Sequence, residues 1–168
     1  YKGFWDLLNL GFIDHMPKIV GVQAENASPI YEAFKAGAER VLFGFVDTVA
    51  DSISVGAPKN WAKALRAVRK SNGDMVTVSD EEILSAIPEM ARATGVFGEP
   101  AGAAAYAGFR KMATQGQLDR DETVAIVVTG NGLKDIQNAR KAAGKPLSVA
   151  PDIEAFEKLL QSDAATSL

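Results

Sequence analysis

A short polar motif, Thr129-Gly-Asn-Gly-Leu-Lys-Asp135, follows the most strand-like run of the chain. Residues Glu122 to Val128 are mostly apolar and β-branched, which predicts a strand buried on both faces of a sheet. A helical pattern begins at Leu133, so the Thr129 hydroxyl is expected at the carboxyl end of a parallel strand, where open α/β sheets bind ligands. The adjacent glycines would let the backbone approach such a ligand closely. On this pattern alone, an ordinary turn between a strand and a helix is the simpler interpretation.

Two further loops have a composition that suits a binding site. Residues Thr48 to Gly56 are small, apolar and rich in hydroxyl groups, which favours lining a site over packing in a core. Residues Gly95 to Pro100 form the other loop, which is expected to take part in the chemistry of the site. Its Glu99 stands immediately before Pro100 and a helical run.

The composition excludes several classes of function. A chain of 168 residues, 47% hydrophobic and 23% charged, suits one globular domain with a substantial core. Lys and Arg number 18 against 21 Asp and Glu, and no basic stripe is present, so nucleic-acid binding is not expected. There is no cysteine, and His15 is the single histidine, so we expect no disulfide, no thiolate nucleophile and no metal site.

Location and completeness can also be judged from the sequence. No apolar run approaches the roughly 20 residues that a membrane span needs, so no membrane partner is expected. The first residues, Tyr1 to Trp5, carry neither an initiator methionine nor a signal-peptide pattern. We therefore expect a cytoplasmic protein, and a chain that is a fragment of a longer one.

Strand and helix patterns alternate along the chain. Strands are predicted at Lys18 to Ala24, Val41 to Phe45, Asp74 to Val78 and Glu122 to Val128. Helices are predicted at residues 1–10, 29–37, 58–70, 80–93, 101–115, 133–143 and 151–160. This order favours an α/β fold of three αβα layers with a mainly parallel sheet. Because three or four strands are few for so many helices, residues outside this chain are expected to supply more of the sheet.

Two of these helices carry specific signals. Ser79 and Glu82 have the spacing of a capping box, which predicts the start of the helix at 80–93. The helix at 101–115 is so rich in alanine and glycine that it must pack very closely against a neighbour.

Four segments, taken in order, resemble a known family. They are Lys18-Ile-Val-Gly-Val-Gln-Ala-Glu25 with Ser28-Pro29, Thr48-Val-Ala-Asp-Ser-Ile-Ser-Val-Gly56 with Asn60-Trp61, Gly95-Val-Phe-Gly-Glu-Pro-Ala-Gly-Ala103, and Val128-Thr-Gly-Asn-Gly-Leu-Lys-Asp135. Together they resemble the C-terminal half of the threonine synthases, fold-type-II enzymes that depend on pyridoxal phosphate. The resemblance implies that residues 1–168 are the C-terminal part of the catalytic domain, with a fold like that of tryptophan synthase β. The N-terminal half, with the lysine that forms the Schiff base, would be absent.

The resemblance implies a reaction, a cofactor and partners. Threonine synthases are lyases of threonine biosynthesis that convert O-phosphohomoserine and water into threonine and phosphate with pyridoxal phosphate. The partners would be the N-terminal half of the same enzyme and a second copy in a homodimer, and the isolated chain would be inactive. A related fold-type-II enzyme, such as a threonine/serine dehydratase or a cysteate synthase, is one alternative. A non-catalytic binding or assembly module is the other.

The resemblance also implies roles for individual residues. Thr129 would place its hydroxyl at the pyridine nitrogen of the cofactor, with Glu99, Gly130 and Asn131 close to the ring. For Glu99 the alternative is a structural carboxylate that caps the helix after it. Ala50 and Ser52 match a segment that lines the substrate site, whereas Asp51 and Gly102 depart from the family pattern.

Lys134 does not qualify as the residue that binds the cofactor covalently. It lies in the first turn of a predicted helix, where the motif does not place the aldehyde group of the cofactor within its reach. By resemblance, the Schiff-base lysine belongs to the missing half, so no residue of this chain is assigned a catalytic role.

Overall fold

The structure is a computed structural model that describes residues 1–144 and 146–161. Its elements in chain order are α1 (Lys2–Asn9), β1 (Val20–Ala24), η1 (Glu25–Ala27), α2 (Pro29–Lys35), η2 (Asp51–Ile53), α3 (Trp61–Lys70), β2 (Asp74–Val78), α4 (Asp80–Thr94), α5 (Pro100–Thr114), η3 (Gly132–Lys134), α6 (Ile136–Ala143) and α7 (Ile153–Leu160), where η marks a 3-10 helix. Each predicted helix is present, with bounds that differ by a few residues. No helix among the described residues is long and apolar enough to cross a membrane.

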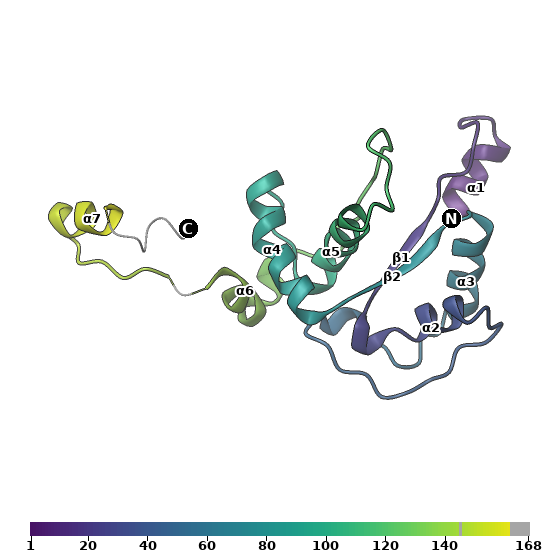
Figure 1. Cartoon of the computed structure of the whole chain (residues 1–168), viewed down its shortest axis with the longest axis horizontal. Coiled ribbons are helices and arrows are strands. Elements are labelled where there is room, and N and C mark those ends of the chain that lie inside the picture. Colours follow the sequence, from purple (N-terminus) through teal and green to yellow (C-terminus); the bar gives the residue numbers. More distant parts are fainter. Residues whose placement is uncertain (145, 162–168) are drawn as a thin grey trace.

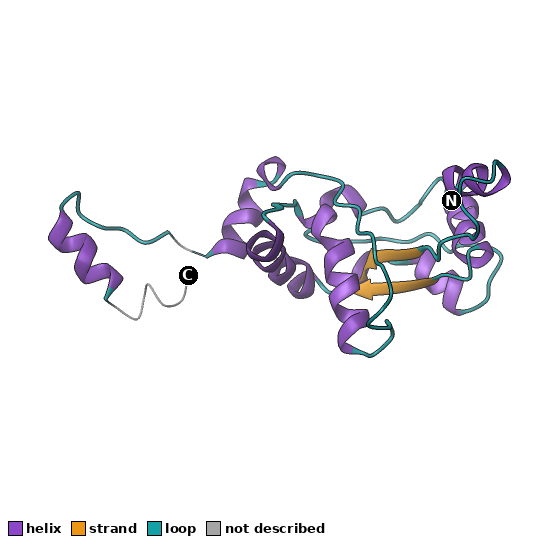
Figure 2. Cartoon of the chain, turned by 90° about the horizontal axis from the view of Figure 1, so that it is seen from above, coloured by secondary structure: helices purple, strands orange, loops and turns teal. Residues whose placement is uncertain are grey.

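A two-stranded parallel sheet forms the centre of the fold. β1 pairs with β2 in a register that runs from Val20 opposite Asp74 to Ala24 opposite Val78. Figures 1 and 2 show α5 on one side of the strands and α3 on the other, so the layers are helix, sheet and helix. This arrangement confirms the α/β class and the parallel sheet.

The alternation of side chains along β1 and β2 determines which helix each face meets. On one face, a Cβ placed on Gly21 would lie 2.3 Å from Met75 Sδ, with Val68 of α3 beyond it. On the other face, a Cβ placed on Gly108 of α5 would lie 2.6 Å from Val22 Cγ2. Glycine is therefore the residue that lets α5 lie against the strands.

The main core lies between β1, β2, α4 and α5. Helix α5 contributes only small residues to it, and α4 contributes larger ones. The fully or almost fully buried residues of this core are Ala24, Ala27, Ala50, Val78, Ile83, Ala86, Ile87, Met90, Ala103, Ala104 and Ala107. The close packing predicted for the alanine- and glycine-rich helix is thus confirmed.

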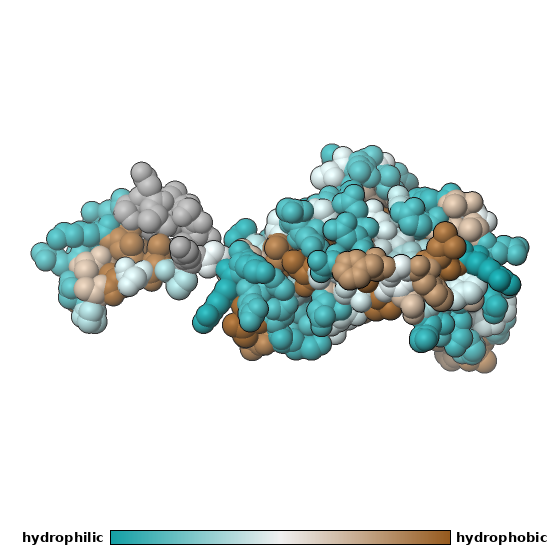
Figure 3. Space-filling view, turned by 90° about the horizontal axis from the view of Figure 1, so that it is seen from below, coloured by the Kyte–Doolittle hydropathy of each residue, from teal (hydrophilic) through white to brown (hydrophobic). Residues whose placement is uncertain are grey.

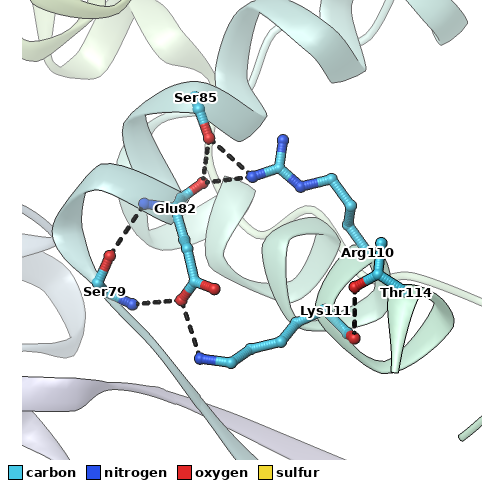
Figure 4. Close-up of polar contacts among 6 residues, drawn as sticks. All are labelled: Ser79, Glu82, Ser85, Arg110, Lys111 and Thr114. Carbon is cyan, nitrogen blue, oxygen red and sulfur yellow. Dashed lines mark hydrogen bonds and ion pairs between the residues drawn. The ribbon is translucent and has the colours of Figure 1, made fainter. Parts of the chain in front are cut away.

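Polar contacts join α4 to α5 at the edge of this core (Figure 4). The capping box is confirmed, because Ser79 Oγ accepts from the Glu82 N–H at 3.2 Å and Glu82 Oε2 accepts from the Ser79 N–H at 2.7 Å. The same Glu82 oxygen accepts from Lys111 Nζ at 3.0 Å. Arg110 donates to Ser85 Oγ at 2.7 Å. Glu82 therefore caps its own helix and fixes α5 against it.

Two predicted strands are absent from the described part of the chain. Residues Val41 to Phe45 and Glu122 to Val128 have no sheet partner among the described residues, so both predictions are wrong for this chain. The β-branched composition of the second segment suits a buried strand, but a strand exists only where a neighbour completes its hydrogen bonds. Val127 is 72% exposed and Phe45 is 95% exposed, although Val41 is buried, so neither segment is buried along its length as its composition predicts.

Apolar side chains are exposed over several parts of the surface. Figure 3 shows apolar patches on the body of the molecule and on α7, which Figure 1 shows standing away from the body. Ile153, Phe156 and Leu160 of α7 are all at least half exposed. Exposed apolar surface on this scale is unusual for a monomeric globular protein.

We expect Gly108→Ala to lower the free energy of unfolding by about 1–3 kcal/mol, because the new methyl group would overpack the contact with Val22. Gly3→Ala is the matched control, since Gly3 also lies inside a helix but a Cβ added there would meet no atom within 4 Å. There the helix preference of alanine should stabilise slightly. Urea unfolding of the two variants measures the difference, and equal midpoints would contradict the close packing of α5.

Candidate active site

Two loops that are distant in sequence pair with each other beside the start of α5. Gly98 and Asn131 form an antiparallel bridge. The Glu99 N–H donates to the Gly130 carbonyl at 3.0 Å, and the Gly132 N–H donates to the Phe97 carbonyl at 3.0 Å. The structure thereby brings together Glu99, Gly130 and Asn131, three of the residues that the sequence associates with a cofactor.

Glu99 is a buried carboxylate, with only 6% of the residue exposed. Its backbone carbonyl accepts from the Ala103 N–H at 2.8 Å, so Glu99 is the N-cap residue of α5. Its side chain makes no capping hydrogen bond and instead lies 3.1 Å from Lys134 Nζ. The alternative of a helix-capping carboxylate is therefore wrong for the side chain.

Gly130 and Gly102 allow this close approach. A Cβ on Gly130 would lie 1.8 Å from Glu99 Oε1, so the carboxyl group occupies the space that a side chain at position 130 would need. A Cβ on Gly102 would lie 2.9 Å from the Gly130 carbonyl oxygen. The departure from the family pattern at Gly102 thus has a physical role, because α5 packs there directly on the backbone of the loop.

Thr129 and Asn131 flank Gly130 and have different environments. Thr129 is exposed, and its hydroxyl has no hydrogen-bond partner among the described residues. The Asn131 side chain is engaged, because its Oδ1 accepts from the Leu133 N–H at 2.9 Å and caps η3. The Thr129 hydroxyl is thus unengaged among the described residues, whereas the Asn131 side chain shapes the loop.

The predicted loop at 48–56 meets the paired loops at 95–100 and 129–135 at a shallow cavity of about 200 Å³. The cavity is lined by Asp51, Ser52, Glu99, Pro100, Ala101, Lys134 and Asp135. Ser52 and Glu99 are the two candidate residues that line it. Ala50 does not, since its side chain is completely buried in the core.

Hydrogen bonds hold the loop that carries Ser52 against two helices. At the start of α4, Asp80 accepts from Thr48 Oγ1 at 2.5 Å and from the Val49 N–H at 3.2 Å. From α6, Asn138 Nδ2 donates to the Val49 carbonyl at 3.3 Å and to Asp135 Oδ2 at 2.7 Å. The cavity wall therefore has a defined position, even though the loop contains no α-helix or strand.

The charge around the cavity is mainly negative. Glu99, Asp51 and Asp135 contribute carboxylates, and among the described residues Lys134 is the one cation that lines the cavity. The N–H of Asn138, and then its side-chain amide, lower the pKa of Asp135 below its usual value of 3.8 by hydrogen bonding to the ionised form. Asp135 is thus ionised throughout the neutral range.

Sequence reasoning missed three residues that organise this site. Lys134 lies within the motif at 129–135, but its pairing with Glu99 depends on how the two loops fold together. Asp80 lies inside the capping box, where nothing distinguishes it from its acidic neighbours. Asn138 follows the motif by one turn and carries no signal in the sequence.

The comparisons with known proteins assign the chain to a family. Residues 1–130 match the family of pyridoxal-phosphate dependent enzymes, and the chain belongs to that family. It is 39% identical over 162 residues to the threonine synthase of Methanocaldococcus jannaschii, which covers 96% of this chain and 40% of the relative. It is 42% identical over 161 residues to the threonine synthase of Methanosarcina acetivorans, covering 95% of this chain and 40% of that relative. The chain thus spans about 40% of the length of these relatives.

A solved structure supports the fold. The processed form of threonine deaminase isoform 2 from Solanum lycopersicum aligns with 76% of this chain and 37% of its own, at a TM-score of 0.59 and 24% identity. At this identity the likeness shows the fold alone, and it agrees with a fold-type-II assignment.

The observed geometry fits part of a site for pyridoxal phosphate, the cofactor of the family. The Thr129 hydroxyl, which has no hydrogen-bond partner among the described residues, is a group that could meet a ring nitrogen, and the space beside Gly130 is filled by the Glu99 carboxyl group. Lys134 Nζ lies 3.1 Å from Glu99 Oε1. These residues suit the pyridine side of a cofactor site.

We expect Asp135→Ala to lower the free energy of unfolding by about 1 kcal/mol at neutral pH, because Asp135 caps α6 through the Asn138 N–H. The lowered pKa of Asp135 means that its charge stabilises the fold above pH 3.8 and that this contribution is lost as the pH falls through the folded-state pKa. The difference from wild type should therefore narrow in acid. Asp135→Asn, which keeps a capping oxygen, is the control, and urea unfolding as a function of pH is the measurement. If the difference in unfolding free energy between wild type and Asp135→Ala did not change with pH, the lowered pKa of Asp135 in the folded protein would be contradicted.

Proposed function

We propose that the complete protein is a threonine synthase, which converts O-phosphohomoserine and water into threonine and phosphate with pyridoxal phosphate. The observation that carries the proposal is the pairing of Gly98 and Glu99 with Gly130 and Asn131, which fixes the backbone next to Thr129, whose hydroxyl has no hydrogen-bond partner among the described residues. Identities of 39% and 42% to threonine synthases over nearly the whole chain support this reaction over others of the family.

Thr129 is assigned to the pyridine nitrogen of the cofactor. When bound, pyridoxal phosphate supplies an electron sink for carbanions at the α and β carbons of the substrate. A neutral hydroxyl at the nitrogen does not force that atom to be protonated, as a carboxylate would. The Thr129 hydroxyl therefore favours a milder sink, which suits elimination and replacement at the β and γ carbons.

The other candidate residues are assigned to shape and to substrate contact. Gly130 and Asn131 form the loop beneath the ring, with Glu99 behind it. The Ser52 hydroxyl, which lines the cavity, is available to hydrogen-bond the substrate. Ala50 contributes by packing, because its buried methyl group supports the turn that carries Ser52. Covalent attachment of the cofactor is assigned to a lysine outside this chain.

The remaining part of the enzyme is proposed to pack on the exposed surfaces of this chain. The edges of the two-stranded sheet are open, and the segment from Glu122 to Val128 has the composition of a buried strand but no partner among the described residues. Phe43 and Phe45 are 60% and 95% exposed. Unpaired sheet edges and apolar side chains of this kind are usually covered in a native assembly. We further propose a homodimer that acts in threonine biosynthesis in the cytoplasm.

The reaction can be tested with the complete protein and added pyridoxal phosphate. We expect O-phosphohomoserine to yield threonine and phosphate in equal amounts, measured by amino-acid analysis and phosphate release. Borohydride reduction followed by peptide mass mapping should locate the cofactor on a lysine outside residues 1–168. Release of ammonia from threonine without phosphate chemistry would contradict the proposal and favour a dehydratase, and an adduct on Lys134 would contradict the assigned site.

A second test concerns the hydroxyl at position 129. Thr129→Val keeps the volume of the side chain but removes a hydrogen bond between two neutral groups, which is worth about 0.5–1.5 kcal/mol. The turnover should then fall roughly 2- to 10-fold, with a shift of the visible absorbance of the cofactor. Thr129→Ser keeps the hydroxyl and should stay close to wild type. Unchanged kinetics and absorbance in Thr129→Val would overturn the contact with the pyridine nitrogen.

A further inference from the structure

Lys134 is the residue of the Thr129–Asp135 motif whose side chain the proposed function leaves unused. Its Nζ lies 3.1 Å from Glu99 Oε1, and the side chains of Lys134 and Glu99 are 61% and 8% exposed. Among the ion pairs of the described residues, this pair is distinguished by an almost fully buried carboxylate. An exposed surface pair contributes little, whereas a buried carboxylate needs a partner.

The position of the Glu99 carboxylate explains why this partner matters. The carboxyl group fills the space beside Gly130, where even a methyl group would collide with it. The other titratable groups that line the same cavity, among the described residues, are Asp51 of η2 and Asp135, and both are acidic. Without Lys134, the described lining of the cavity would hold three carboxylates and no cation.

Lys134 is also tied to the loop that it faces. Its backbone N–H donates to the Asn131 carbonyl at 3.0 Å, while its side chain reaches Glu99. Glu99 in turn donates its backbone N–H to the Gly130 carbonyl. These three contacts form a closed circuit around Gly130, adjacent to Thr129.

We propose that Lys134 is a positioning residue, which holds the Glu99 carboxyl group against Gly130 and so fixes the loop that presents the Thr129 hydroxyl. The role toward the cofactor rests on the proposed function. Lys134 also balances a negative charge close to Thr129. An unbalanced carboxylate there would favour protonation of a nearby ring nitrogen and would oppose the effect of a neutral hydroxyl.

The test uses the complete protein reconstituted with pyridoxal phosphate and five variants. Lys134→Met removes the cation, Lys134→Arg retains it, Glu99→Gln removes the buried charge, and Lys134→Met with Glu99→Gln removes both. Lys63→Met is the matched control, because Lys63 is exposed on α3 and has no ion pair among the described residues. The readouts are the cofactor absorbance, the turnover, and the urea midpoint of the protein without cofactor.

Lys134→Met should lower the urea midpoint, reduce turnover about tenfold and shift the cofactor absorbance from that of wild type. These changes arise because the buried Glu99 carboxyl group loses its counter-charge, and a buried charge without a partner is destabilising. The double variant should lose the absorbance shift and recover most of the turnover. Glu99→Gln should have the smaller effect of the two single variants, since the exposed Lys134 ammonium remains hydrated. Lys134→Arg and Lys63→Met should resemble wild type.

Three outcomes would overturn the proposal. Lys134→Met could behave like Lys63→Met in every readout, or the double variant could be no better than Lys134→Met. The urea midpoint could also fall without any change in the absorbance profile, which would make the pair merely structural. Failure of the proposed function is recognised separately, because the wild-type protein would then bind no pyridoxal phosphate, and this result would overturn the role of Lys134 toward the cofactor. The urea midpoints of the single and double variants would still decide whether the pair holds the loop.

Discussion

The close backbone approach between the start of α5 and the loop at Gly130 is the constraint on which the site depends. Two glycines make it possible, since a Cβ on Gly102 would meet the Gly130 carbonyl and a Cβ on Gly130 would meet the Glu99 carboxyl group. The antiparallel bridge between Gly98 and Asn131 then joins two segments that are distant in sequence. Bulkier residues at Gly102 and Gly130 would separate these backbones. The two glycines therefore help to determine where the loop holds the Thr129 hydroxyl.

The helices around the site act as one support. Small residues let α5 lie directly on the strands, and Glu82, Arg110 and Lys111 hold it against α4. The first residue of α4, Asp80, anchors the loop that carries Ser52. Ser52 is therefore connected to the packed core through only a few contacts. These contacts give its loop a defined position.

The unpaired parts of the chain carry information about the assembly. A family match over residues 1–130 and relatives more than twice as long agree with a two-stranded sheet that leaves its edges open. The exposed apolar residues of the segments at 41–45 and 122–128 agree with the same view. Apolar surface of this kind is unfavourable in water, which is the physical basis for proposing that further protein covers it.

The sequence by itself determined the local structure and much of the candidate site. Period and capping signals located the helices, the capping box at Ser79 and Glu82, and the strands β1 and β2, because these features depend on residues close together in the chain. The motif at Thr129 also pointed to the loop that the structure pairs with Gly98 and Glu99. Only the tertiary structure decided that Glu99 pairs with Lys134 and that Ala50 belongs to the core, because both results depend on contacts between distant segments. It likewise decided against strands at 41–45 and 122–128, since composition reports a tendency to be buried, whereas a strand requires a neighbour to complete its hydrogen bonds.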